Sequence, residues 1–136
     1  MGFFSEIIDT YKANEAGYVI KSIFEENSKL GLLSNVEVDE LSLKLVQNVL
    51  DLQPEIFRGK KGVRPHKLVY ALCALVMGLE LFDKESSIFQ AIILAFGRLQ
   101  MEIINKRHNY SFSNLDELLI NNSMKVTEEL AKNAEA

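Results

Sequence analysis

Hydrophobic residues recur along this chain at helical spacing, and strand-like alternation is absent. The strongest pattern is a pair of apolar runs, residues 68–79 and 88–104, separated by a short charged segment. A helix that is apolar on nearly all sides belongs in the middle of a fold. Because the break between the runs is short, we expect helices over residues 65–82 and 86–106 that pack as an antiparallel hairpin.

The N-terminal third predicts two further helices. Residues 3–30 carry two apolar stripes, and Asn14 and Gly17 between them predict an interruption, since glycine costs about 1 kcal/mol relative to alanine in a helix. Residues 34–38 are expected to form a connector. Asp39 is then the predicted N-cap of an amphipathic helix that continues to Gln53.

Proline and glycine mark the segment before the hairpin. Pro54 should end the preceding helix, and residues 55–64 are expected to form a loop. Pro65 suits the first turn of the next helix, where its missing N–H is no loss.

The C-terminal region predicts two short helices. Ser113 with Asp116 three residues later is typical of a capping box. Residues 121–123 are expected to break that helix, and a last helix should start at Met124. The sequence therefore predicts an all-α protein, a single domain over residues 1–136 built as an irregular bundle of five to six helices around the central hairpin.

Size and cysteine usage narrow the class of protein. A chain of 136 residues is long enough to bury a core. One cysteine allows no disulfide within the monomer, which favours a reducing compartment. The first residues lack the pattern of a signal peptide, and the longest uncharged apolar run, residues 68–79, is shorter than the roughly 20 residues that span a bilayer. We expect a cytoplasmic protein that does not bind membranes.

Charge is distributed unevenly along the chain. The net charge is −4, with ten acidic and four basic residues in 1–55, five basic and no acidic residues in 56–79, and nine acidic and six basic residues in 80–136. If the hairpin is antiparallel, the start of its first helix lies near the end of its second. We call the basic residues gathered there the basic pole: Arg58, Lys60, Lys61, Arg64, His66, Lys67, Lys106, Arg107 and His108.

Two interpretations of the basic pole remain open. With the positive end of a helix beside it, the pole could bind an anion, a nucleic acid or an acidic protein. Alternatively, its side chains stabilise their own helix ends or pair with acidic residues of the N-terminal third.

Two other surfaces are candidates for protein binding. Glu37, Asp39 and Glu40 form a predicted acidic partner face that suits a basic protein. Residues 3–24, which carry an aromatic-rich stripe near a free end, either cover the central hairpin or mediate docking of a partner or a second copy of the chain.

The sequence contains no recognisable catalytic, metal-binding or nucleotide-binding motif. Cys73 lies in the first apolar run and is expected to be a buried core residue rather than a nucleophile. His66 and His108 lack the partner spacing of metal sites, so no metal or other cofactor is expected. No glycine-rich nucleotide loop is present.

These observations favour a binding protein. We expect a non-enzymatic helical protein that acts on a macromolecular partner, most readily a protein, in the manner of small inhibitors, immunity proteins and adaptors. The alternative is an anion or nucleic-acid binder that uses the basic pole.

Overall fold

All the secondary structure in the described part of the chain is helical. The structure is a computed structural model that describes residues 3–28, 33–57 and 64–135, with side chains described for residues 14–26, 33–57 and 64–132. Its elements are α1 (Phe3–Ser28), α2 (Asn35–Leu52), α3 (Pro54–Phe57), α4 (Lys67–Gly78), α5 (Ser87–Asn105) and α6 (Asn114–Glu135), with the 3-10 turns η1 (Leu79–Leu81) and η2 (Arg107–Asn109). The predicted irregular bundle of five to six helices is confirmed.

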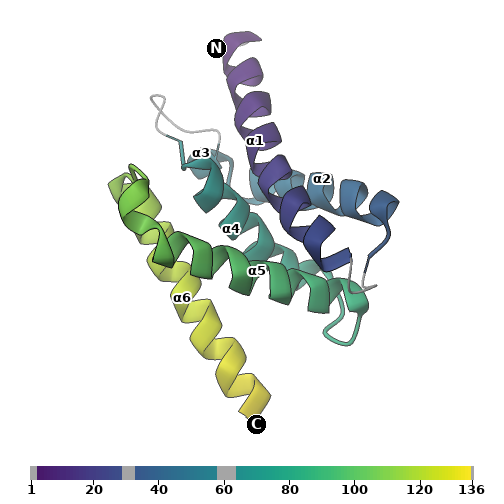
Figure 1. The fold of residues 1–136 in the computed structure, drawn as a ribbon. Helices are drawn as coiled ribbons and strands as arrows, with labels where there is room; N and C mark the ends of the chain where they lie inside the picture. Colours follow the sequence, from purple (N-terminus) through teal and green to yellow (C-terminus); the bar gives the residue numbers. More distant parts are fainter. Residues whose placement is uncertain (1–2, 29–32, 58–63, 136) are drawn as a thin grey trace.

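Helix α4 lies at the centre of the bundle (Figure 1). It contacts α1, α2, α5 and α6, and every residue from Leu68 to Leu75 is buried. A helix covered on all sides can be apolar on all sides without exposing that surface to water. The composition of α4 is therefore explained by its position.

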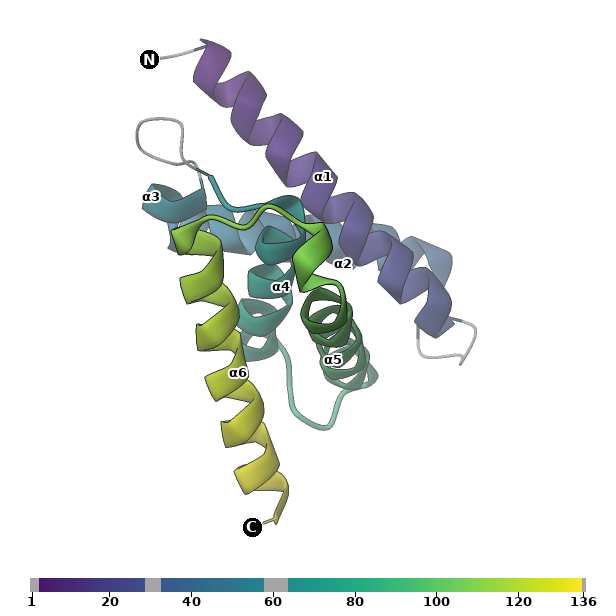
Figure 2. The ribbon, with the colours of Figure 1, turned by 60° about the vertical axis from the view of Figure 1, so that its left-hand side comes forward.

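Helix α5 returns across α4 in the opposite direction, which makes the predicted hairpin (Figures 1 and 2). Ser86 caps α5 by accepting a hydrogen bond from the Phe89 N–H at 3.1 Å. By length and composition alone α5 could also span a membrane, and 44% of its most apolar window is buried in the fold. Core helices of soluble proteins have the same properties.

The first hairpin helix is shorter than the predicted range of 65–82. His66 is the N-cap, so α4 begins at Lys67, and the buried Pro65 precedes the cap rather than occupying the first turn. After Gly78 the chain tightens into η1 and then becomes extended at Phe82.

Helices α2 and α4 approach closely at one glycine. A Cβ atom added to Gly78 would lie 2.1 Å from Leu45 Cδ2, and Leu45 is fully buried. Glycine is favoured here because any larger residue would have to displace the buried Leu45 side chain.

The predicted interruption of the N-terminal helix is wrong, because α1 continues through Asn14 and Gly17. Ala16, Ile20 and Phe24 are fully buried beside α2 and α4, and this packing outweighs the roughly 1 kcal/mol cost of one glycine. The N-terminal half of α1 extends beyond the other helices (Figures 1 and 2).

The start of α2 also differs from the prediction. Ser34, not Asp39, is the N-cap, and residues 35–38 are helical rather than a connector. The Ser34 Oγ accepts a hydrogen bond from the Glu37 N–H at 3.3 Å, and Glu37 Oε1 accepts one from the Ser34 N–H at 3.2 Å. This reciprocal capping box fixes the start of the helix.

Part of the predicted loop over residues 55–64 is helical. Pro54 begins α3, and Phe57 at its end is buried. The Phe57 ring meets the Tyr70 ring of α4 edge-on, with 4.7 Å between their centroids. Aromatic packing therefore holds this turn against the core.

The C-terminal region forms one helix instead of two. The capping box at its start is confirmed, since Ser113 Oγ accepts from the Asp116 N–H at 3.1 Å and Asp116 Oδ2 accepts from the Ser113 N–H at 2.9 Å. The predicted break at residues 121–123 is wrong. There the Ser123 hydroxyl donates to the Ile120 carbonyl at 2.6 Å and lies 3.4 Å from Gln100 Nε2 of α5, so its polar group is satisfied within the helix packing.

Candidate functional site

The start of α4 and the end of α5 lie at one end of the molecule. The His66 ring lies 5.6 Å from the Tyr110 ring and 5.2 Å from the Phe112 ring, measured between centroids. Tyr110 follows η2, and its N–H donates to the Arg107 carbonyl at 3.2 Å. Six residues of the basic pole are described at this end: Arg64, His66, Lys67, Lys106, Arg107 and His108. The remaining three, Arg58, Lys60 and Lys61, lie outside the described residues.

The first amide groups of α4 are already bonded to the protein. His66 Nδ1 accepts a hydrogen bond from the Leu68 N–H at 3.1 Å. The His66 N–H donates to Asp116 Oδ1 at 2.8 Å, and Asp116 is only 3% exposed. Since these donors have protein acceptors, this helix end offers fewer free N–H groups to an anion than its sequence suggests.

Several cations of the basic pole also have acidic neighbours. Arg107 forms an ion pair with Glu117 of α6, and its Nε lies 3.3 Å from Glu117 Oε1. Lys106 Nζ lies 3.5 Å from Glu102 Oε1, one helical turn back. The Lys106 contact fits the interpretation in which basic residues stabilise their own helix ends, whereas Arg107 links the end of α5 to the start of α6.

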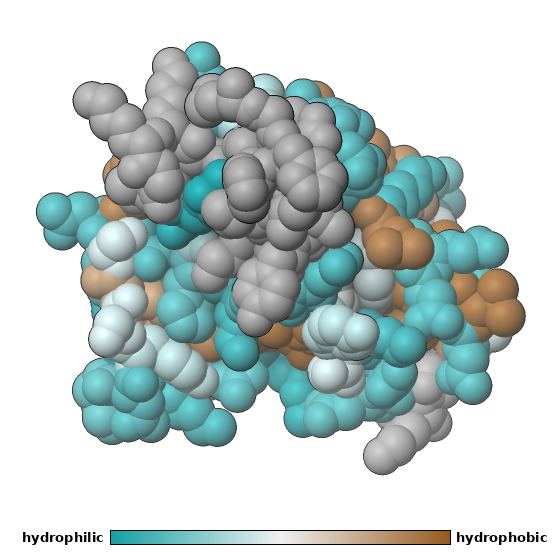
Figure 3. Space-filling view, turned by 90° about the horizontal axis from the view of Figure 1, so that it is seen from above, coloured by the Kyte–Doolittle hydropathy of each residue, from teal (hydrophilic) through white to brown (hydrophobic). Residues whose placement is uncertain are grey.

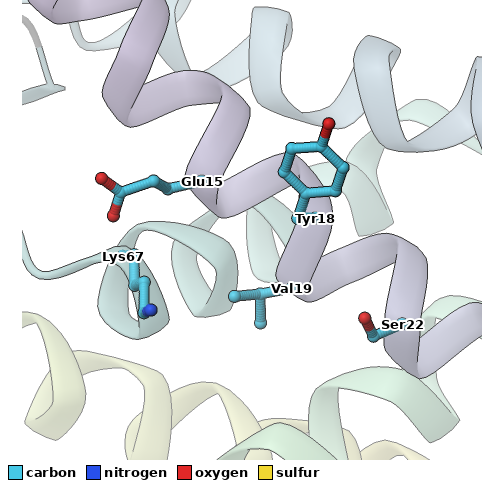
Figure 4. A pocket seen from close by; sticks show the side chains of 5 residues that line it. All are labelled: Glu15, Tyr18, Val19, Ser22 and Lys67. Atoms are coloured by element: carbon cyan, nitrogen blue, oxygen red, sulfur yellow. The ribbon is translucent and has the colours of Figure 1, made fainter.

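Lys67 occupies a different environment, an open pocket of about 260 Å³ between α1 and α4 (Figure 4). The other lining residues are Glu15, Tyr18, Val19 and Ser22, all from α1. Lys67 is exposed and makes no ion pair with any residue that the structure describes. The end of the molecule from which α1 projects is mostly hydrophilic in its described part (Figure 3).

The three residues of the acidic partner face do not share one environment. Glu37 belongs to the Ser34 capping box. Asp39 turns toward α1, where its Oδ1 lies 2.9 Å from Lys21 Nζ and raises the pKa of that lysine. Glu40 is exposed and has no ion pair within the described part of the chain. Of the three, Glu40 is the carboxylate most available to a partner.

Exposed apolar side chains flank Glu40 on the outward side of α2. Val36 and Leu43 are 67% and 68% exposed and lie four residues before and three residues after it. Gln47 continues the same line one turn further on. We call Val36, Glu40, Leu43 and Gln47 the α2 outer face. The signal in the sequence was the pair of apolar residues placed off the buried stripe of the helix.

A second exposed apolar surface lies on α5. The stripe expected to face the core is buried at Ile92, Ala95, Leu99 and Ile103. The opposite side exposes Leu94 (48%), Met101 (57%) and Ile104 (38%), together with Gly97. We call Leu94, Gly97, Met101 and Ile104 the α5 face. Sequence reasoning missed it because apolar residues occupy this outward side of the helix as well as the core-facing side, and the pattern does not say which of the two is covered.

The sequence left two roles open for residues 3–24, packing against the bundle or docking a partner or a second copy. Part of this segment packs against the bundle. Ile20, Ile23 and Phe24 belong to the hydrophobic core, where they pack against other helices of the bundle. The side chains of residues 3–13 lie outside the described set. Tyr18, 70% exposed, is the large apolar residue that this segment presents among its described side chains.

Cys73 is buried in α4, as the sequence predicts for a core residue. Burial raises the pKa of its thiol to about 12, and the nearby Asp116 carboxylate adds to the effect. A thiol held neutral in this way is a poor nucleophile. Among the described residues, no three His, Cys, Asp or Glu side chains are grouped so that they could hold a metal ion.

Comparison with known proteins adds no assignment, because no protein-family model, curated protein or solved structure matches this chain. The candidate surfaces therefore rest on their own geometry. The α2 outer face and the α5 face each group two or more exposed large apolar side chains on one side of a single helix.

Proposed function

We propose that this protein is a non-enzymatic helical binding protein that docks another protein through the α2 outer face, in the manner of small inhibitors, immunity proteins or adaptors. The observation that carries the proposal is the free carboxylate of Glu40 between two side chains, Val36 and Leu43, that are each about two-thirds exposed. Exposed apolar side chains grouped with one charge are typical of interaction surfaces.

The two chemical components of this face have different roles. Burying Val36 and Leu43 against a partner would remove apolar surface from water, at about 25 cal/mol per Å². The Glu40 carboxylate would select partners with a complementary charge and speed their encounter. The excess of acidic residues in 1–55 acts in the same direction over a longer range. The partner we propose presents a lysine or arginine beside an apolar depression.

The α2 outer face can be altered without altering the core. The opposite side of α2, including Val38, Leu41, Leu45 and Val49, is buried and holds the helix in the bundle. Since Leu43 is mostly in solvent, its replacement should leave the fold intact. Loss of binding in such a variant would therefore report on the surface itself.

Binding of an anion or nucleic acid at the basic pole is the second candidate function. It is favoured by the exposed ammonium group of Lys67 at an open pocket. The ion pair of Arg107 and the capping role of His66 favour it less. In this case binding should weaken steeply as salt is raised.

Partner capture distinguishes the two candidates. The tagged full chain is incubated with a lysate of its source, with and without nuclease, beside the variants Leu43→Ser and Glu40→Lys. Leu52→Ser is the matched control, because Leu52 is also on α2 and 62% exposed but lies off the outer face. We expect a protein that is retained by wild type and by Leu52→Ser, is lost from the other two variants, and is insensitive to nuclease.

The opposite results would favour the basic pole. If Leu43→Ser and Glu40→Lys retain every partner, the α2 outer face is not the binding surface. If nuclease or the double change Lys60→Glu and Lys61→Glu removes the captured material, the partner is bound through nucleic acid or through the basic pole. Circular dichroism of each variant confirms that the helices are retained.

A further inference from the structure

The N-cap of α4 differs in chemistry from the other side-chain caps in the described part of the chain. Ser34, Ser86 and Ser113 cap α2, α5 and α6 with hydroxyl groups, which keep the same charge throughout the physiological pH range. His66 caps α4 with an imidazole ring, a group that ordinarily changes its charge near pH 6.5, at about the pH of many cell compartments. The capping bond at the start of α4 can therefore respond to pH.

The capping bond of His66 exists only while its ring is neutral. Nδ1 accepts the hydrogen bond from the Leu68 N–H at 3.1 Å, so the single proton of the neutral ring is on Nε2. A protonated ring carries an N–H on both nitrogens, and its Nδ1 would then meet the Leu68 N–H donor to donor. Protonation also places a positive charge at the positive end of the α4 dipole. Both effects disfavour the charged ring in the capping position.

His66 also joins the start of α4 to residues 106–113, which we call the α5–α6 connection. This connection crosses the start of α4 (Figure 2). The His66 ring packs against two of its rings, with centroids 5.6 Å away at Tyr110 and 5.2 Å away at Phe112. The backbone N–H of His66 donates to Asp116 Oδ1 of α6 at 2.8 Å. A ring that leaves the capping position would therefore change the packing of the connection as well as the start of α4.

Charged and titratable groups from several segments lie around the start of α4. They are Arg64 and Lys67 in the same segment, Arg107, His108 and Tyr110 after α5, Asp116 and Glu117 of α6, and Glu15 of α1 across the pocket of Lys67. Asp116 favours a charged ring, but its two oxygens already accept the His66 and Ser113 N–H groups. Glu117 is paired with Arg107. Arg64 and Lys67, close to the ring in the chain, oppose a further positive charge on it.

We infer that His66 is a pH-sensitive switch between α4 and the α5–α6 connection. With a neutral ring, His66 caps α4 and packs against Tyr110 and Phe112. With a protonated ring, the capping bond from the Leu68 N–H is lost, and the first turn of α4 and the α5–α6 connection loosen together. The ring is half-buried, so a proton reaches it from solvent without unfolding of the bundle.

The sign of the pH effect follows from the protonation of the two states. An imidazole in the unfolded chain takes up its proton near pH 6.5, at about its ordinary value. The capped ring of the folded protein binds the proton less readily, so the unfolded chain holds more protons as the pH falls through this region. The stability that the cap contributes is therefore complete above about pH 7.5 and is lost progressively between about pH 7 and about pH 5.

Amide hydrogen exchange of the full chain, followed by NMR at about pH 7.5 and about pH 5, tests this inference. The protection factor of the Leu68 amide, corrected for intrinsic exchange, should fall roughly fivefold or more, as expected for the loss of one N-cap bond. The Tyr110 amide, which donates to the Arg107 carbonyl, should lose protection over the same interval. The Phe89 amide is the internal control, because it donates to a serine hydroxyl and should stay protected.

Two histidine variants distinguish the switch from other titrating groups. His66→Asn keeps a good N-cap whose side-chain oxygen accepts a hydrogen bond at every pH, so its Leu68 amide should remain protected on acidification. His108→Asn is the matched control, because His108 is the other histidine of the chain and is exposed. This control should lose Leu68 protection as wild type does. The wild-type exchange data test the inference on their own if either variant folds poorly.

Three results would overturn the inference. The first is a Leu68 amide that is equally protected at both pH values in wild type. The second is a loss of protection that persists in His66→Asn, which would assign the titration to another group. The third is a loss at Leu68 that leaves Tyr110 unchanged, which would show that α4 and the α5–α6 connection do not loosen together. None of these results involves the α2 outer face, so the proposed function and this inference can fail separately.

Discussion

The two helices of the central hairpin are both strongly apolar, yet they differ in what covers them. Helix α4 contacts four other helices and is buried at every position from Leu68 to Leu75. Helix α5 is buried along one side and exposes Leu94, Met101 and Ile104 on the other. Burial in the fold explains why α4 is apolar, but it explains only the apolar residues on the core-facing side of α5.

This difference distinguishes the apolar residues that stabilise the fold from those that are free to contact a partner. Apolar side chains in α4 contribute to the free energy of folding through burial and close packing. Those on the α5 face remain in solvent in the monomer and contribute little to it. A surface that retains apolar residues without needing them for folding is a candidate for binding.

The largest expected effect is the loss of a buried leucine. Leu72→Ala in α4 should lower the free energy of unfolding by about 2–5 kcal/mol, because it leaves a cavity in a fully covered helix. Leu94→Ala in α5 removes the same atoms from an exposed position and should cost less than about 0.5 kcal/mol. Urea unfolding at low protein concentration measures both. Equal losses in the two variants would mean that α5 is covered as fully as α4.

Substituting alanine for one glycine in α4 and one in α5 compares the two helices more sharply, because the two changes should have opposite signs. Gly78→Ala places a methyl group against the fully buried Leu45, so we expect a loss of about 1–3 kcal/mol. Gly97→Ala enters open space within a helix and should stabilise the monomer by about 0.5–1 kcal/mol. Thermal unfolding of the dilute proteins shows whether each substitution lowers or raises stability. A stabilised Gly78→Ala would show that α2 and α4 do not approach as closely as described.

The buried acid beneath the basic pole should also matter for stability. Asp116→Asn replaces one of the two carboxylate oxygens that accept the His66 and Ser113 N–H groups, leaving one donor without an acceptor. We expect a loss of about 1–3 kcal/mol in urea unfolding. Asp83→Asn is the control, because Asp83 accepts from the Glu85 N–H in an exposed turn. Equal effects would place Asp116 in solvent.

The smallest expected effect is a pH dependence from Cys73. Its pKa is raised from 9.0 to about 12 in the folded protein, so the folded state keeps the proton at a pH where the unfolded state loses it. The stability contributed by the neutral thiol is therefore complete below pH 9 and declines between pH 9 and about pH 12. Stability of wild type relative to Cys73→Ala should fall as pH rises from 8 to 10. A constant difference would indicate a solvent-exposed thiol.

The sequence predicted those features whose causes are local or strongly periodic. The two apolar runs predicted the hairpin, and Ser113 with Asp116 predicted the start of α6. The start of α2 was missed because both Ser34 and Asp39 are good capping residues, and only the reciprocal contact with Glu37 distinguishes them. The continuity of α1 through Gly17 depends on packing against other helices, which local propensity does not include.

The candidate surfaces were harder to predict than the fold. Periodicity indicates which side of α2 is buried, but the exposure of Val36 and Leu43 beside Glu40 depends on how the other helices are arranged. In α5 apolar residues occupy the outward side as well as the core-facing side, so the sequence alone does not say which of the two is open. The basic pole was inferred from topology, and the engagement of Arg107 by Glu117 could be known only from the tertiary structure.

Thiol accessibility tests the contrast between the two hairpin helices most directly. In a Cys73→Ala background, Leu72→Cys in α4 and Met101→Cys in α5 are labelled with a thiol reagent at low protein concentration. We predict that Met101→Cys reacts nearly as fast as the unfolded chain, while Leu72→Cys reacts only on unfolding. Slow labelling of Met101→Cys would contradict the account, since it would mean that the fold itself covers the outward side of α5.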